Sequence, residues 1–274
     1  MKIPLRSRLF TLCADDFGQS RPINDAILEL VRCYRLGAVS VMSQGPAWEE
    51  GARALKECQQ MADVGLHLNL THRFKGSPCV RPLLWWLCAA PLGLIRREPV
   101  RAAFQAQIDE FVKHFGRLPD YLDGHQHVHA FPIIREVLTE LIADNWQGQP
   151  LPWVRAPDCL LDAGRVPLKA WVLRRATRGF AEDLERIGLR HTRRFGGLYA
   201  LAAQGNFAKL MRGWLNELPS GTLLMVHPGK QSFDLSDSIR AARLEEYAYL
   251  NGREFAQDAI AADASFVRFA QLPA

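Results

Sequence analysis

Side chains that could bind a metal ion or move a proton follow the apolar, strand-like runs of this sequence. They are aspartates and histidines, with one arginine: Asp15, Asp16, His67, His125, His127, His129, Arg155 and His227. The carboxyl ends of the strands in a parallel α/β sheet lie at one edge, so residues distant in sequence converge there. The pattern therefore predicts one shared site, and its residue types are typical of a metal-dependent hydrolase.

Two imidazoles and one carboxylate form a common open site for Zn²⁺ or a related divalent ion. Such an ion polarises a carbonyl and acidifies a water, while a free carboxylate takes the proton. Side chains alternate along a strand, so of the adjacent Asp15 and Asp16 one would bind the metal and the other would face the water. A histidine from another strand end, such as His227, would protonate a leaving amine as an imidazolium near neutral pH.

Most of these residues also have a purely structural interpretation. Asp15-Asp16-Phe17-Gly18 fits a turn in which an aspartate caps backbone amides, worth about 1 kcal/mol. His67 fits a core histidine with a satisfied hydrogen bond, and His227-Pro228-Gly229 fits a turn after a strand. Arg155 fits a surface cation, or an arginine that binds a carboxylate or a substrate oxygen.

The run His125-Gln126-His127-Val128-His129 is less ambiguous. If the run is extended, its three imidazoles lie on one side, and so many polar groups are costly to bury without partners. The run therefore predicts that at least one of these histidines contacts a metal or a substrate.

Length and composition favour one α/β domain. The chain has 274 residues, of which 48% are apolar, and one barrel of roughly 250 residues is an ordinary solution at this length. The net charge is +5 and arginines crowd residues 174–194, but acidic residues are interspersed and no nucleic-acid motif accompanies them. We therefore expect a single catalytic domain over residues 1–274, with a solvated basic face and no nucleic-acid partner.

The cysteines and the first residues predict a cytoplasmic protein. The six cysteines are widely spaced with no Cys-x-x-Cys pair, which fits reduced thiols. Residues 1–8 hold no long apolar stretch, so no secretory signal is expected.

Strand-like runs alternate with segments of helical period, the pattern of βα units around a mainly parallel sheet. Strands are expected at residues 9–14, 39–42, 62 to about 70, 121–124, 153–154 and 222–226. Helices are expected at residues 22–36, 48–61, 100–115, 132–144, 169–175, 207–217 and 240–262. Residues 71–99 are expected to be irregular.

Residues 83–95 depart from this rhythm. They are apolar, contain two tryptophans, are interrupted by Pro91 and Gly93, and are followed by Arg96 and Arg97. Thirteen residues are too few to span a bilayer, which needs about 20. One interpretation is a buried insertion, at about 73–99, that covers one end of the barrel. The other is a lid or interfacial segment that brings residues 83–97 to the inner membrane surface and a lipid-borne substrate.

These residues together resemble the YdjC-like carbohydrate deacetylases, which include chitooligosaccharide deacetylases and the hopanoid-associated HpnK group. The matching motifs occur in the family's order across residues 9–250: Ala14-Asp15-Asp16-Phe17-Gly18, residues 65–71, residues 123–129, Arg155-Ala156-Pro157 and residues 225–229, with residues 243–247 and Leu250 similar to its C-terminal helix. The resemblance implies a distorted (β/α) TIM-like barrel related to the polysaccharide deacetylases.

The resemblance also implies roles for individual residues. Asp16, His67 and His125 would bind one divalent metal ion, either Mg²⁺, Zn²⁺ or Mn²⁺. Asp15 would be the general base and His227 the general acid. A third group would contact the substrate or orient the ligands: Arg155, His127 and His129. Gly124 stands where the chitooligosaccharide enzymes carry serine, so the carrier of the acetylated sugar stays open.

The leading interpretation is a metal-dependent hydrolase that removes an N-acetyl group from an amino sugar, carried by an oligosaccharide or a lipid. One alternative is a metal-dependent hydrolase of another bond such as a phosphoester, although no two-metal carboxylate set is evident. The other is a non-catalytic sugar- or lipid-binding protein, against which the Asp15-Asp16 pair argues. A homodimer stays open, because no feature of the sequence selects it.

Overall fold

A curled parallel sheet forms the centre of the computed structural model, which describes residues 7–161, 166–202 and 205–272. The strands are β1 Arg8–Phe17, β2 Ala38–Val41, β3 Asp63–Leu68, β4 Tyr121–Gly124, β5 Trp153–Val154, β6 Phe195–Gly196, β7 Thr222–Val226 and β8 Ala264–Phe266. Their order is β5-β4-β3-β2-β1-β7-β6, and β8 pairs with β1. All of the pairings are parallel.

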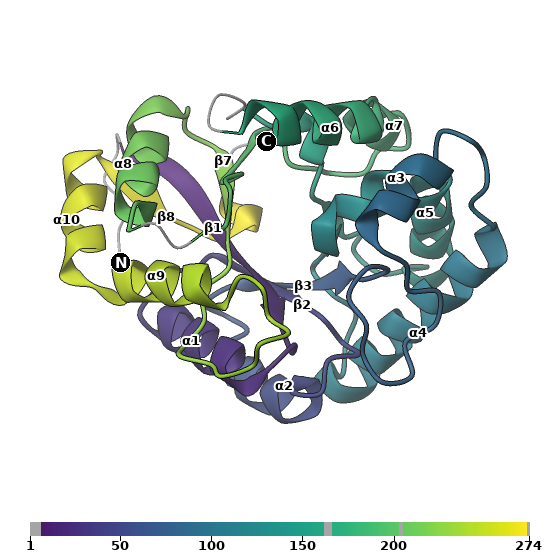
Figure 1. Ribbon diagram of the computed structural model, residues 1–274, viewed down its shortest axis with the longest axis horizontal. Helices are drawn as coiled ribbons and strands as arrows, with labels where there is room; N and C mark the ends of the chain where they lie inside the picture. Colours follow the sequence, from purple (N-terminus) through teal and green to yellow (C-terminus); the bar gives the residue numbers. More distant parts are fainter. Residues whose placement is uncertain (1–6, 162–165, 203–204, 273–274) are drawn as a thin grey trace.

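Helices surround the sheet (Figure 1). They are α1 Arg21–Arg32, α2 Trp48–Glu57, α3 Leu83–Ala89, α4 Arg97–Phe115, α5 Ile134–Asn145, α6 Pro167–Thr177, α7 Phe180–Arg186, α8 Phe207–Glu217, α9 Arg240–Asn251 and α10 Arg253–Ala261. Short 3₁₀ turns follow β4, β5 and β8, at His125–Ala130 (η1), Pro157–Cys159 (η2) and Phe269–Gln271 (η3). No helix in the described ranges is long and apolar enough to cross a membrane.

The two ends of the sheet approach each other without forming a regular ladder. Isolated parallel bridges join Val154 of β5 to His191, and Leu160 to Phe195 of β6. The sheet therefore curls into an irregularly closed barrel, and the predicted distorted (β/α) barrel is confirmed.

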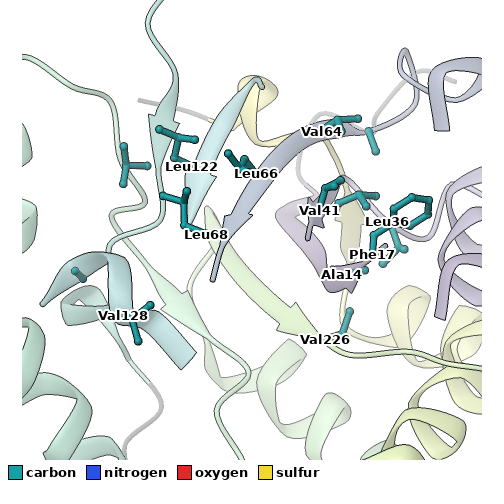
Figure 2. Close-up of a cluster of buried hydrophobic side chains, with 14 of the residues drawn as sticks. Ala14, Phe17, Leu36, Val41, Val64, Leu66, Leu68, Leu122, Val128 and Val226 are labelled. Atoms are coloured by element: carbon teal, nitrogen blue, oxygen red, sulfur yellow. The ribbon is translucent and has the colours of Figure 1, made fainter. Parts of the chain in front are cut away.

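The strands read as apolar runs because both of their faces are covered. Every residue of β2, β3 and β7 is buried. Figure 2 shows Val41, Leu66 and Leu122, from three neighbouring strands, within this core. The helices present one apolar stripe to it, as α1 does with Ile23, Ile27 and Leu30.

The structure corrects several expected element boundaries. Residues 71–99 are not wholly irregular, since they contain α3. The helix expected at 132–144 begins at Ile134, because Ile133 has a left-handed backbone with φ of 70°. The helix expected at 240–262 is two helices, because Gly252 between them is extended at ψ 168°. The pattern also missed α7, β6 and β8.

Candidate active site

A cavity of about 310 Å³ lies at the carboxyl ends of the central strands. Six of the predicted residues line it: Asp15, Asp16, His67, His125, His127 and His227. They come from the end of β1, from β3, from η1 and from the residue after β7. The structure thus brings together side chains up to 212 positions apart in the chain.

Both aspartates face this cavity, which simple strand alternation does not allow. Asp16 has a left-handed backbone with φ of 71°, and the pairing of β1 with β2 shifts register between Ala14 and Phe17. This irregularity turns Asp16 toward the side that Asp15 already occupies. The expected separation by alternation is therefore wrong, and a local bulge aims the two carboxylates.

Asp16, His67 and His125 form a group that could hold one metal ion, because a ligand atom from each lies within 4.8 Å of the others. Asp16 Oδ1 is 3.1 Å from His125 Nδ1 and 3.6 Å from His67 Nε2. An ion bound at about 2.1 Å places its ligand atoms about 3.0 to 3.4 Å apart. The two distances from Asp16 lie within a few tenths of an ångström of this range, so the group could hold one divalent ion.

Charged groups behind these ligands fix their orientation. Asp123 and His67 Nδ1 share a hydrogen bond of 2.7 Å, which aims Nε2 at the cavity. Arg243 donates to the outer oxygen of Asp16 at 2.7 Å and to Asp237 at 2.9 Å. Burial alone would raise the pKa of Asp16, but Arg243 and His125 hold it well below its usual range. The carboxylate is therefore ionised, as a metal ligand must be.

Asp15 is held by Arg155 and not by this metal group. Both Asp15 oxygens accept hydrogen bonds from the Arg155 guanidinium, at 2.7 and 2.6 Å. Burial would raise the pKa of Asp15, but Arg155 and His67 lower it below its usual range. Asp15 is thus ionised at neutral pH and fixed in direction, which suits a carboxylate that accepts a proton.

Arg155 does not contact the cavity. Its side chain is fully buried, and its guanidinium also binds Asp123 at 2.6 Å. The carboxylate-binding alternative for Arg155 is the one observed, and its contact with a substrate stays a prediction. Cys13, Asp15 and Asp123 also have metal-ligand spacing, but Arg155 lies among them, 2.9 Å from the Cys13 sulfur, so an ion has no room there.

The histidine run is not extended. It forms η1, with left-handed backbones at Gln126 and His127, so its imidazoles point in different directions. His125 faces Asp16, and His127 lines the cavity with its ring 5.4 Å from that of Phe195. His129 is fully buried and its Nε2 donates to the Arg155 carbonyl at 2.8 Å. His129 therefore supports the turn from within the core, and its predicted role toward a substrate or the metal ligands stays a prediction.

His227 lines the cavity next to Asp15. Its Nε2 is 3.9 Å from Asp15 Oδ2. Burial lowers the pKa of His227 to about 4, which the carboxylates of Asp15 and Asp16 only partly offset. The resting imidazole is thus neutral at pH 7, and the expected imidazolium is not its resting form.

Glu246 of α9 supports His227 from behind. Its carboxylate accepts hydrogen bonds from the His227 backbone amide and, at 2.5 Å, from the Tyr199 hydroxyl. One of its oxygens is 3.9 Å from His227 Nδ1. Sequence reasoning missed Glu246, Arg243, Asp123 and Asp237. For two of them a signal existed, because Arg243 and Glu246 lie three positions apart on the buried face of α9.

The cavity has a polar side and an apolar side. Its polar side beyond the metal group includes Gln19, His72, Ser236, Asp237 and Ser238. Its apolar side includes Leu83 and Leu87 of α3, Val172 and Leu173 of α6, and Leu198 and Leu201. The apolar insertion is therefore a wall of the cavity, with Trp86 buried behind it.

Fold and site together define an α/β barrel protein with a candidate single-metal centre at the carboxyl ends of its strands. Within that class the chain belongs to the YdjC-like protein family, whose sequence profile matches residues 9–260.

Individual relatives agree with this assignment. The chain is 28% identical to a carbohydrate deacetylase of Mus musculus over 80% of its own length and 77% of that protein. It is 30% identical to a chitooligosaccharide deacetylase of Escherichia fergusonii over 50% of its length and 57% of that protein. The same fold occurs in the crystal structure of an Enterococcus faecalis V583 protein that is described in connection with cellobiose-phosphate cleavage. The two structures superpose with a TM-score of 0.70 at 17% sequence identity, over 97% of this chain and 98% of that one.

Proposed function

We propose that the protein hydrolyses the N-acetyl group of an acetylated amino sugar with the help of one divalent metal ion. The observation that carries this proposal is the pairing, in one cavity, of a three-residue metal group with a separate ionised carboxylate, Asp15. Binding alone requires no such free base. The names of the mouse and Escherichia relatives, both deacetylases of carbohydrates, support the same reaction.

Asp16, His67 and His125 would hold the ion. Once bound, such an ion polarises the acetyl carbonyl and makes a water more acidic. Asp15, oriented by Arg155, accepts the proton of the attacking water. His227 is neutral at rest, so the proton that it delivers must reach it during the reaction. Its Nε2 is 3.9 Å from Asp15 Oδ2, so His227 can take the proton that Asp15 has accepted and pass it to the departing amine. The products are acetate and the free amino sugar.

The polar side of the cavity would hold the sugar hydroxyls, with His127 also in reach of the substrate. The apolar side suits the carrier of the sugar, either an oligosaccharide with an apolar face or a lipid. We place this reaction in the cytoplasm, since all six cysteines are free thiols. A lipid carrier would bring the enzyme to the inner membrane surface.

The decisive experiment is acetate release from free, oligomeric and lipid-linked N-acetylglucosamine compounds by metal-stripped protein resupplied with Zn²⁺, Mg²⁺ or Mn²⁺. Asp15→Asn should lower the rate about 10²- to 10⁴-fold while bound metal, measured by elemental analysis, stays unchanged. Asp16→Asn, the adjacent control, should lose the metal itself.

Full activity in Asp15→Asn would contradict the assigned base. Metal binding without acetate from any compound would reject the proposed reaction, and phosphoester substrates and equilibrium sugar binding would then separate the two alternatives.

A further inference from the structure

Exposed apolar side chains gather around the mouth of the cavity. Of fourteen large hydrophobic residues exposed in the described ranges, eight lie in three segments: Leu84, Trp85, Leu92, Leu94, Leu168, Trp171, Phe233 and Leu235. The segments are residues 71–99, 166–178 and 228–240, which we call the rim. The rim holds 55 of the 274 residues, about a fifth of the chain. Exposed large hydrophobic residues are therefore more frequent in the rim than an even distribution along the chain would give.

Each rim segment borders the cavity on one side and solvent on the other. Leu83 and Leu87 of α3 line the cavity while Leu84 is 71% exposed. In α6, Val172 lines it while Trp171 is 64% exposed. Residues 236–239 line it in the third segment, next to Phe233 and Leu235. Figure 1 shows α3, α6 and the stretch between β7 and α9 around the strand ends.

The rim is also the basic part of the molecule. It contains eleven lysines and arginines and three acidic residues, a net charge of +8, whereas the whole chain carries +5. Some of these cations are paired, as Arg97 is with Glu136 and Lys230 with Glu29. Arg73, Lys75, Arg81 and Arg96 have no ion pair with any residue in the described ranges.

The exposed apolar and cationic side chains of the rim limit the kinds of partner that this surface could bind. A second copy of the chain, docked rim to rim, would bring two faces with an excess of positive charge together and be repelled. An oligosaccharide in water supplies neither an apolar phase nor anionic groups. A bilayer with anionic lipids supplies both, since tryptophan and leucine enter the headgroup boundary and each Lys or Arg near the surface contributes about 1 kcal/mol.

We infer that the rim binds an anionic lipid bilayer, with the cavity mouth facing the membrane. This deepens the proposed function, on which it rests, by naming the surface where the active site works. The contact involves α6 and residues 228–240 as well as the segment around α3.

The test is co-sedimentation of the full chain with vesicles of phosphatidylcholine alone or mixed with phosphatidylglycerol. We expect binding to the mixed vesicles that weakens as salt is raised. The variant Trp85→Ser/Trp171→Ser/Phe233→Ser should bind at least tenfold more weakly. Leu151→Ser/Ile260→Ser changes exposed apolar residues away from the rim and should bind as the wild type does.

Thermal unfolding of each variant checks that it folds, and acetate release from a water-soluble substrate checks the site, since none of the five changed residues lines the cavity. Absence of wild-type binding, an equal loss in the control variant, or a rim-dependent dimer in light scattering would overturn the inference. Vesicle binding without turnover would instead reject the proposed function and leave the membrane contact standing.

Discussion

The pKa of Glu246 is strongly changed by the buried surroundings of its carboxyl group. Its side chain is fully buried, and burial raises its pKa to about 7, although hydrogen bonds from Tyr199 and the His227 amide oppose this. The unfolded chain has a pKa near 4.5 at this position. Between pH 4.5 and 7 the folded protein therefore holds a proton that the unfolded chain releases, and stability falls as pH rises through this window.

Replacing Glu246 by Gln should remove this pH dependence. The shift corresponds to about 3 kcal/mol at most, present below pH 4.5 and lost by about pH 7. Thermal unfolding from pH 4.5 to 8 should show the wild type losing stability relative to Glu246→Gln, with the difference constant above pH 7. Glu245→Gln, on the neighbouring residue, should leave the wild-type slope in place. Parallel curves for wild type and Glu246→Gln would contradict this assignment.

The turn after β4 determines which histidines reach the site. Left-handed backbones at Gln126 and His127 fold His129 back beneath Gly124. A Cβ atom at Gly124 would lie 2.8 Å from His129 Nδ1 and 3.0 Å from its Cβ, closer than packed atoms allow. Glycine is therefore required by this close approach, even though its φ of −157° suits any residue.

Gly124→Ala should lower the free energy of unfolding by about 1–3 kcal/mol, the usual result of overpacking a filled core. Denaturant unfolding would measure it. The partner change His129→Ala removes the obstructing ring, so the double variant should lose less stability than the sum of the two single variants. Strict additivity would show that Gly124 and His129 do not compete for space.

The barrel as a whole brings the three candidate ligands together from β1, β3 and η1. An ion shared by these elements would favour the folded chain, because the unfolded chain has no such site. A ligand at 100 times its dissociation constant stabilises a protein by about 2.7 kcal/mol.

Chelation should therefore lower the melting temperature, and resupply of the native ion should restore it. Comparing Zn²⁺, Mg²⁺ and Mn²⁺ at equal concentration would identify that ion as the one with the largest shift. Asp16→Asn should abolish the response, while Asp237→Asn, on the same cavity but outside the ligand group, should retain it. A melting temperature unchanged by any of the ions would exclude a metal centre in this cavity.

Much of this architecture follows from the sequence by itself. The apolar runs at β4, β5 and β7 and the helix Phe207–Glu217 are found where their periodicity predicts them. The strand ends also predicted which residues meet, because parallel strands all point their carboxyl ends to one edge. This rule brings Asp16, His67 and His125 to the same edge of the sheet, whereas the left-handed backbone of Asp16 directs its carboxylate into the cavity.

Only the tertiary structure decided how those residues are held. His67 meets Asp123 56 positions away, Asp15 meets Arg155 140 positions away, and the His227 amide meets Glu246 across 19 positions. It also decided that Asp16 and His127 adopt left-handed backbones, which redirect their side chains. Local periodicity fixes the face on which a side chain lies, whereas the pairing of buried charges depends on how distant strands and helices align across the barrel.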